Sequence, residues 1–367
     1  MNRSSLDRIH TQILWDRLLA VVEEQAQTLV RTAFSTTVRE AGDISAGVFD
    51  TQGRMLAQAV TGTPGHVNAM AASVGFFLQK FPVEDLHPED VLLTNDPWYG
   101  TGHLNDFTVI TPVFRKGRPV ALFAATSHIA DVGGLGFGPD GRQVFEEGLN
   151  IPMGYLYRAG EPNEVLLEIL RANVRDPRSA EGDLHSLTAC NRAGVESLLA
   201  TLDEFGMDDL DTAGRVIVDN SRDAMLAEIR KLPFGSWTNT MRIDGYDDPV
   251  DLVCKLTIGE TGIDVDFSGT SPVCSHGINV PLTYTQAYAS FGVRCVVGND
   301  IPNNAGSLEV VRVTAPEGCI LNAPRPAAVS ARHAIGQMLP DVVLGCLEEP
   351  LGGNVPAEGA SCLFGPV

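Results

Sequence analysis

Two apolar runs joined by a tight turn constrain the fold of this chain more than any other feature of its sequence. Residues 107–114 and 119–126 consist mostly of strand-forming residues, and the four residues between them place Gly117 where a hairpin turn needs a positive φ. This pattern predicts an antiparallel β-hairpin. Because a hairpin returns the chain to its starting point, we expect residues just before the first run to lie beside residues just after the second.

Polar residues gather at those two ends. Residues 95–106 read NDPWYGTGHLND, and residues 127–134 read SHIADVGG. The hairpin should bring His128 next to His103 and Asp106. Two imidazoles with one or two carboxylates suit Zn, Mn or Fe(II) better than Ca or Mg, which prefer oxygen ligands alone. Three protein ligands leave coordination positions open, as a catalytic metal requires.

The same residues have a simpler interpretation. A histidine at a strand end is often half-buried and hydrogen-bonded, and an aspartate before a strand often caps a turn. The spacing gives the metal-site hypothesis equal standing with this one, and Gly133 and Gly134 leave room beside the backbone. The glycine-rich stretch 133–141 lacks the Gly-Lys-Ser/Thr of a phosphate loop, so we interpret it as a mobile loop over the metal.

The rest of the chain predicts a mixed α/β fold in which long helices accompany antiparallel or mixed sheets. Residues 44–59 predict a second hairpin, and residues 164–232 predict three consecutive helices. Other helices are expected up to residue 33, from 67 to 81, after 281 and from 333 to 348. Besides the hairpin strands at 107–114 and 119–127, strands are expected at 91–95, 235–244, 249–257, 262–267 and 308–314.

The chain is longer than one average domain, at 367 residues. We divide it into an N-terminal α/β region (1–160) that carries the metal-site candidates, a helical segment (161–232) and a second α/β region (233–367). The expected architecture is therefore one large elaborated domain, or two lobes, with a helical insertion.

Composition excludes several classes of function. The chain has 26 basic and 46 acidic residues and a formal net charge of −20, so it would repel nucleic acid. It contains neither a signal-peptide pattern nor an apolar run of the roughly 20 residues that a bilayer span needs. Its seven cysteines form no Cys-x-x-Cys pair, so we expect free thiols in a cytoplasmic protein. The absence of a Gly-x-Ser-x-Gly elbow disfavours acyl-enzyme chemistry.

The two motif segments resemble those of the hydantoinase B/oxoprolinase family. The similarity continues along most of the chain, through REAGDIS (39–45), GHVNAM (65–70), EEGLNIP (146–152), GDL (182–184), DFSGTSP (266–272) and IPNNAG (301–306). The chain departs from the family pattern at Trp98, where Tyr or His is usual, and at Ile129, where a second His is frequent. Family members are usually longer, so we expect this chain to be truncated at its C-terminus relative to them.

The resemblance also implies which residues act. It implies a divalent transition metal held by His103, Asp106 and His128. It further suggests four candidates near that metal: His66, Asp43 and Glu147 in the catalytic pocket, and Asp131 as a fourth ligand or as the partner of a ligating imidazole. On its sequence alone, Glu147 suits a solvated acidic turn better than a catalytic role, and the resemblance brings the two interpretations level; His66 would equally suit the first turn of a helix.

The reaction, too, is implied by the resemblance. Family enzymes use ATP to open cyclic amides such as hydantoins, N-methylhydantoins and 5-oxoproline, or to carboxylate ketones. The ATP-using step is assigned to an A-type partner subunit, which agrees with the lack of a Walker motif in this chain. We therefore expect a B-type subunit of a cyclic-amide hydrolase in a hetero-oligomer. The alternatives are the alpha-type subunit of an ATP-dependent ketone carboxylase and a non-catalytic scaffold or inactive fragment.

Overall fold

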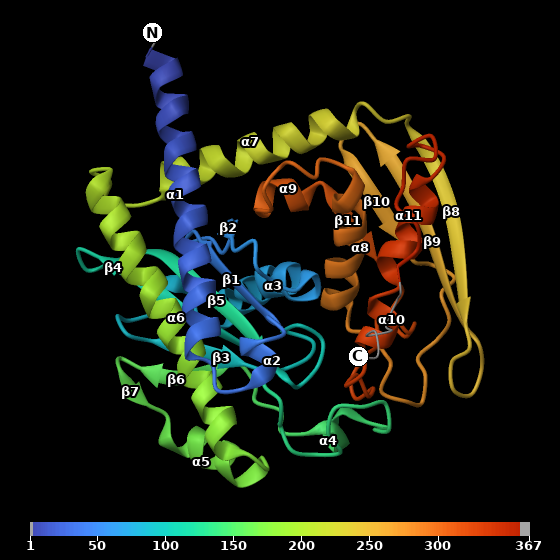
Figure 1. The fold of residues 1–367 in the computed structure, drawn as a ribbon, viewed down its shortest axis with the longest axis horizontal. Coiled ribbons are helices and arrows are strands. Elements are labelled where there is room, and N and C mark those ends of the chain that lie inside the picture. Colours follow the sequence, from blue (N-terminus) through green and yellow to red (C-terminus); the bar gives the residue numbers. More distant parts are fainter. Residues whose placement is uncertain (1–2, 360–367) are drawn as a thin grey trace.

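Two β-sheets with helices packed on them organise the computed structural model, which describes residues 3–359 (Figure 1). The predicted mixed α/β class is confirmed. The helices are α1 (Arg3–Thr32), α2 (Thr36–Arg39), α3 (Pro64–Lys80), α4 (Val144–Glu147), α5 (Glu164–Asn173), α6 (Pro177–Glu204), α7 (Asp211–Ile229), α8 (Leu282–Val296), α9 (Ala305–Glu309), α10 (His333–Gly336) and α11 (Leu339–Leu347). The strands are β1 (Ile44–Phe49), β2 (Met55–Gln58), β3 (Val91–Thr94), β4 (Asp106–Arg115), β5 (Arg118–His128), β6 (Gly154–Arg158), β7 (Glu161–Pro162), β8 (Gly235–Ile243), β9 (Val250–Gly259), β10 (Gly262–Asp266) and β11 (Val311–Thr314).

The predicted central hairpin is present as β4 and β5. Its turn residues, Lys116 and Gly117, have φ values of 51° and 78°, as a tight two-residue turn requires. The strands pair in a register that sets Asp106 opposite His128. They form the middle of an antiparallel sheet with the order β2-β1-β5-β4-β3-β6-β7. The start of β4 and the end of β5 therefore lie side by side at one end of these strands. The polar residues singled out in the sequence are found at that end.

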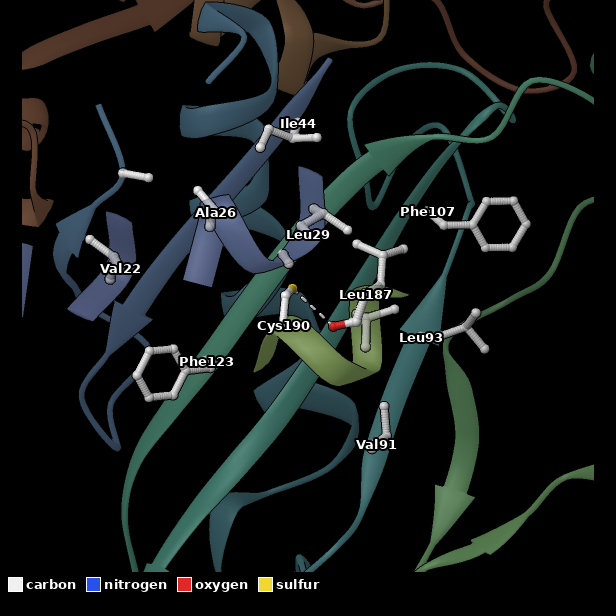
Figure 2. Close-up of a cluster of buried hydrophobic side chains, with 14 of the residues drawn as sticks. Val22, Ala26, Leu29, Ile44, Val91, Leu93, Phe107, Phe123, Leu187 and Cys190 are labelled. Carbon is white, nitrogen blue, oxygen red and sulfur yellow. Dashed lines mark hydrogen bonds between the residues drawn. The ribbon is translucent and has the colours of Figure 1, made fainter. Parts of the chain in front are cut away.

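Helices bury both faces of this seven-stranded sheet. Phe123 faces the core formed with α1 and α6 (Figure 2), as does Val109. Their neighbours Leu122 and Ile110 face a second core formed with α3. Successive side chains of a strand point to opposite faces, so a strand buried on both sides is apolar without alternation. This explains why residues 107–114 and 119–126 read as continuous apolar runs.

The smaller sheet has the order β11-β10-β9-β8 and is covered on one face by α8 and α11 (Figure 1). The antiparallel meander β8–β10 is as predicted, and β11 adds to it as a parallel neighbour of β10. The long helix α7 contributes Ile217 to the core of the first sheet and Met225 to the core of the second. It therefore connects the two packing units.

Some predicted elements were wrong in detail. Helix α3 begins at Pro64, not at residue 67, because proline is accepted in the first turn and Thr63 stands at the N-cap. Residues 308 and 309, expected at the start of the strand 308–314, instead end the helix α9, which begins at a capping box formed by Asn304 and Ser307. The helix expected over 333–348 is divided into α10 and α11, and Pro340, which has no amide to donate, lies in the first turn of the second.

The sequence prediction also missed the hairpin of β6 and β7, although its signals are visible. Tyr155 and Tyr157 flank a buried leucine, and a turn at Ala159 and Gly160 follows them. Both turn residues have positive φ.

Between residues 3 and 359, no helix has both the length and the apolar character needed to cross a bilayer. The six cysteines in that range are free, and Cys362 lies outside the described residues.

A buried amide pair fastens α1 and α6 to the central hairpin. Asn191 of α6 donates to the carbonyl oxygens of Val109 and Phe123, at 3.2 and 3.4 Å, and accepts from Gln25 Nε2 at 2.8 Å. Gln25 of α1 also donates to the carbonyl oxygen of Ala124. Both amide side chains are fully buried. Removing either one therefore leaves buried polar groups without partners.

We expect Asn191→Ala to lower the free energy of unfolding by about 2–4 kcal/mol, because it removes several buried hydrogen bonds and leaves Gln25 with the Ala124 carbonyl but without its bond to residue 191. The control is Thr188→Ala on the same helix, whose hydroxyl donates to the carbonyl of Leu184 one turn earlier. Urea denaturation of both variants checks the prediction. Equal, small decreases in the free energy of unfolding of both variants would show that the amide pair does not stabilise the packing of α1 and α6 on the hairpin.

Candidate metal centre

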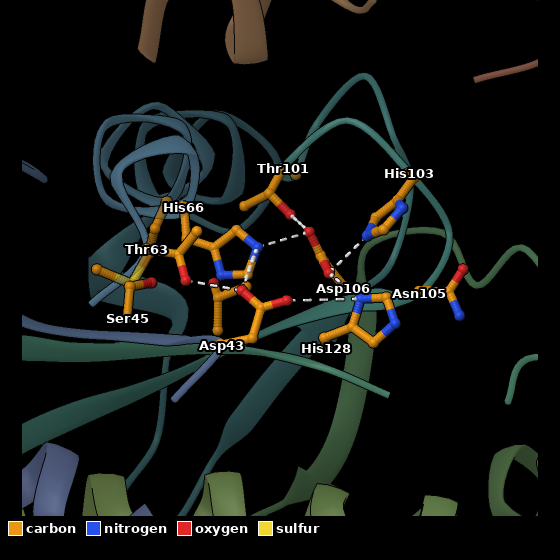
Figure 3. Close-up of polar contacts among 12 residues, drawn as sticks. Asp43, Ser45, Thr63, His66, Thr101, His103, Asn105, Asp106 and His128 are labelled. Atoms are coloured by element: carbon orange, nitrogen blue, oxygen red, sulfur yellow. Dashed lines mark hydrogen bonds and ion pairs between the residues drawn. The ribbon is translucent and has the colours of Figure 1, made fainter. Parts of the chain in front are cut away.

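Asp106, the first residue of β4, is the centre of a buried polar cluster (Figure 3). Its carboxylate oxygen Oδ1 lies 2.7 Å from His103 Nε2 and 3.1 Å from His128 Nδ1. The two imidazole rings lie 5.1 Å apart, centroid to centroid. The hairpin register brings His128 to this place, and the turn that precedes β4 brings His103.

The other carboxylate oxygen of Asp106 has three further partners. Oδ2 lies 2.9 Å from His66 Nε2, accepts from Arg332 Nη2 at 2.6 Å and accepts from the hydroxyl of Thr101. Burial alone would favour the protonated acid, but interactions with the imidazoles of His103 and His66 and with the guanidinium of Arg332 hold the pKa of Asp106 well below its usual value. Asp106 is therefore an anion although only 1% of its surface is exposed.

His103 is oriented by a backbone carbonyl from a distant part of the chain. Its Nδ1 lies 3.0 Å from the oxygen of Ser330, which can only accept, so Nδ1 carries a proton. Burial, together with the charge of Arg332, lowers the pKa of His103 to about 3, and the ring is neutral. Its unprotonated Nε2 then faces the Asp106 carboxylate at 2.7 Å. Two acceptors at this distance are stabilised by a cation shared between them.

The donor set fits a divalent transition metal. One nitrogen each of His103 and His128 and one oxygen of Asp106 all lie within 4.8 Å of one another, and all three residues are buried. Neutral imidazole and carboxylate are the ligands that Zn, Mn and Fe(II) take in proteins. A carbonyl that fixes the tautomer of a ligating histidine is also typical of metal sites.

A second group of three overlaps the first but suits a proton better than a metal. Asp43 Oδ1 lies 3.5 Å from His66 Nε2, and Thr63 donates to the same oxygen at 2.7 Å. Burial opposes the charged imidazole, but Asp106 and Asp43 raise the pKa of His66. The guanidinium of Arg332 already neutralises Asp106 Oδ2. His66 therefore holds a proton between two carboxylates.

A third group of ligand-type residues lies apart from the first two. It consists of Asp247, Cys274 and His276. Arg142 places a guanidinium nitrogen 3.2 Å from His276 Nδ1, the atom on which the group converges. Because a cationic side chain already occupies this position, we do not assign a metal to the group.

The cluster also contains residues that the sequence did not reveal. Phe137 stands over it, with its ring centroid 5.6 Å from that of His103 and 5.3 Å from that of His128, and it stacks on His333 at 4.9 Å. Phe137 is 51% exposed and belongs to the glycine-rich stretch that was predicted to lie over the metal. Arg332 is 226 residues from Asp106 in the sequence, so no local pattern could connect the two.

Asp131 is not brought to the cluster, although the sequence suggested it as a metal contact. Its carboxylate accepts from the backbone of Gly133 and Asp176 and from Arg175 Nη1, at 3.0, 3.1 and 2.9 Å. It also accepts from the backbone N–H of Arg175. These contacts tie the glycine-rich loop to the start of α6, and both oxygens are used there.

Glu147 is buried near the cluster, but it faces backbone rather than imidazole. Its Oε1 accepts from the N–H groups of Val329 and Ser330, at 2.7 and 2.8 Å. Burial raises the pKa of Glu147 to about 7 against the opposing effect of these two hydrogen bonds. The carboxyl group therefore has no contact with the metal-ligand candidates themselves.

A cavity of about 880 Å³ lies elsewhere, beside α6. It is lined in part by Tyr157, His185 and Arg192, and the Tyr157 hydroxyl lies 3.0 Å from His185 Nδ1. None of the three groups of potential metal ligands among the described residues lines it. We therefore place the candidate site at Asp106 rather than at this cavity.

The chain belongs to the hydantoinase B/oxoprolinase family, whose model matches residues 7–365. The family expected from the sequence motifs is thereby confirmed. A Pseudomonas sp. protein described as the B-type component of a D-/L-hydantoinase is 28% identical over 96% of this chain and 63% of its own length. The chain spans the same share, 63%, of the first curated relatives that it matches.

Two solved structures share the fold. An ATP-dependent caprolactamase from Pseudomonas jessenii is 25% identical, with a TM-score of 0.87, over 94% of this chain and 60% of its own. An acetone carboxylase, solved without nucleotide, is 19% identical, with a TM-score of 0.85, over 94% of this chain and 48% of its own. At that lower identity the second likeness concerns the fold alone.

The raised pKa of Glu147 predicts a pH-dependent stability. Because its pKa rises from 4.5 to about 7 on folding, the stability that the protonated group contributes is fully present below pH 4.5 and is lost as pH rises through 7. Glu147→Gln cannot ionise. The free energy of unfolding of the variant minus that of the wild type should therefore increase by about 3 kcal/mol from pH 4.5 to 8. Urea denaturation across this range measures it, and a constant difference contradicts it.

Proposed function

We propose that this chain is the metal-dependent B-type subunit of an ATP-dependent enzyme that opens a cyclic amide. The observation that carries the proposal is the convergence of His103 Nε2 and His128 Nδ1 on one oxygen of Asp106, in a member of this family. The hydantoinase and caprolactamase relatives support a cyclic amide as the substrate class.

The metal site would be formed by His103, His128 and Asp106. When bound, a Zn, Mn or Fe ion supplies a Lewis acid that polarises oxygen. Arg332 and Thr101 hold the second oxygen of Asp106, so its first oxygen keeps a fixed direction. The carbonyl of Ser330 keeps the His103 proton on Nδ1, so Nε2 remains free to act as a ligand.

Proton transfer is assigned to His66 and Asp43. The Nε2 of His66 lies within 3.5 Å of carboxylate oxygens of both Asp106 and Asp43, and no hydrogen-bond partner for its Nδ1 is found among the described residues. His66 can therefore hold a proton on Nε2 and pass it to the leaving nitrogen of an opened ring, with Asp43 stabilising the charged imidazole. The Phe137 ring covers the cluster and limits its access to water.

An A-type ATPase subunit is the proposed partner. An amide carbonyl is a poor electrophile, and phosphorylating its oxygen makes attack by water feasible. The sequence contains no Walker motif, the glycine-rich loop with a lysine that binds the phosphates of a nucleotide. We therefore assign ATP to the partner, in a cytoplasmic hetero-oligomer.

Ketone carboxylation is the alternative reaction for the same site. The acetone carboxylase likeness supports a shared fold, whereas the hydantoinase and caprolactamase likenesses favour the amide. A scaffold without chemistry of its own would not require the buried set of His103, Asp106 and His128. The reactions are separated by the substrates that stimulate ATP hydrolysis.

We expect His103→Ala to reduce bound metal from about one equivalent per chain to less than a tenth and to abolish turnover, because three protein ligands become two. Elemental analysis and activity assays check this prediction. The matched control is His87→Ala, which removes an imidazole whose side chain is 67% exposed. Unchanged metal content in His103→Ala would refute the assignment.

Co-purification with an A-type subunit should give a complex that hydrolyses ATP slowly when no substrate is added. Hydantoins or lactams should stimulate ATP hydrolysis at least tenfold, because their phosphorylation is coupled to ring opening in this subunit. Ketones with bicarbonate serve as the comparison. Stimulation by ketones alone would replace the amide assignment with carboxylation, and stimulation by neither class would contradict both.

A further inference from the structure

We propose that Glu147 is a positioning residue that fixes the tautomer of His103 through the backbone of residues 329–331. The proposal gives Glu147 a role other than the proton transfer suggested by its sequence motif. Its consequence for catalysis rests on the proposed function, whereas its consequence for His103 can be observed without metal, partner or substrate.

The first part of this connection is a contact between two distant chain segments. The segment that ends at Glu147 lies against residues 326–330: Gln143 forms a β-bridge with Ala327, and the N–H of Val144 donates to the carbonyl of Pro326 at 3.0 Å. At the other end, Glu147 Oε1 accepts from two consecutive backbone N–H groups. The segment 326–330 is therefore held at both ends.

The second part is the direction of the Ser330 carbonyl. A peptide unit is planar, and its C=O and N–H point in opposite directions. The N–H that belongs to the same peptide as the Ser330 oxygen is that of Ala331, which donates to the carbonyl of Gly277 at 2.7 Å. With the N–H groups of Val329 and Ser330 held by Glu147, the Ser330 oxygen is directed away from Gly277 and toward His103.

The third part is the choice of tautomer. The Ser330 oxygen lies 3.0 Å from His103 Nδ1 and accepts a proton from it, so the proton of the neutral ring stays on Nδ1. Two residues further along the chain, Arg332 donates to Asp106 Oδ2 at 2.6 Å and to the carbonyl of Thr101 at 2.6 Å. One segment thus directs both a histidine and a carboxylate of the candidate metal centre.

Glu147 is packed so that only its position, not its charge, is needed for this task. A Cβ atom at Gly277 would lie 3.0 Å from Glu147 Oε1, and one at Gly141 would lie 3.1 Å from its Cγ. Among the described residues, no hydrogen-bond partner is found for Oε2. Only Oε1 makes the connection, and a glutamine offers the same acceptor atom at the same place.

The test is ¹⁵N NMR of the metal-free protein with labelled histidine, in which the two ring nitrogens report the tautomer. The chain has eight histidines, and the signals that disappear in His103→Ala identify this one. Wild type and Glu147→Gln should show the Nδ1–H form. Glu147→Ala should shift His103 toward the Nε2–H form, because the backbone at Val329 and Ser330 loses its anchor and the Ala331–Gly277 hydrogen bond is left to direct the Ser330 carbonyl. Glu146→Ala, which truncates the exposed neighbouring carboxylate, is the matched control.

Metal titration of the same variants gives a second readout. Glu147→Ala should bind Zn or Mn 10- to 100-fold more weakly than wild type, as expected when a group that orients a ligand is lost, while Glu147→Gln and Glu146→Ala bind normally. If Glu147→Ala does not fold, Gly277→Ala is the second variant, because its added Cβ displaces Oε1 and should give the same change of tautomer.

The possible outcomes separate this proposal from the proposed function. An unchanged His103 tautomer in folded Glu147→Ala overturns the positioning role. Loss of turnover in Glu147→Gln with an unchanged tautomer overturns it as well, in favour of proton transfer by the carboxyl group. A change of tautomer in a protein whose wild type binds no metal supports the positioning role and refutes the metal-dependent function.

Discussion

The buried carboxylate of Asp106 is the interaction on which the rest of the centre depends. Five groups converge on its two oxygens, and they come from α3, from the turn before β4, from the end of β5 and from the segment at Arg332. An unpaired charge in this position would be costly. The folded state therefore has to bring all four parts of the chain together, since the buried carboxylate is stable only when its partners are in place.

The two sides of Asp106 differ in a way that matters for chemistry. On the Oδ2 side, Arg332 and a proton-holding His66 supply positive charge from the protein itself. On the Oδ1 side, the neutral His103 presents a lone pair, and positive charge has to come from outside the chain. One carboxylate thus separates the proposed metal site from the proposed proton site. The proposed hydrolysis of an activated amide would use both.

Short-range patterns could predict much of this arrangement. The hairpin turn at Gly117 and the two apolar runs fixed the meeting of His103, Asp106 and His128, because the register of a short hairpin leaves little freedom. Arg332 and Phe137 were not predicted, since their contacts depend on how distant segments pack. Asp131 was misplaced for the same reason: its motif lies close to the ligands in sequence, but Arg175 holds it elsewhere. The ligand roles and the domain boundaries at 160 and 232 stay predictions.

The most direct test of the central claim is a crystal structure of the protein loaded with Zn or Mn, with anomalous scattering measured at the absorption edge of that metal. The account predicts one strong peak bounded by His103 Nε2, His128 Nδ1 and Asp106 Oδ1, on the side of the carboxylate away from Arg332. A fully loaded crystal whose anomalous peak lies elsewhere, or in which the two imidazoles turn away from a shared ion, would contradict it.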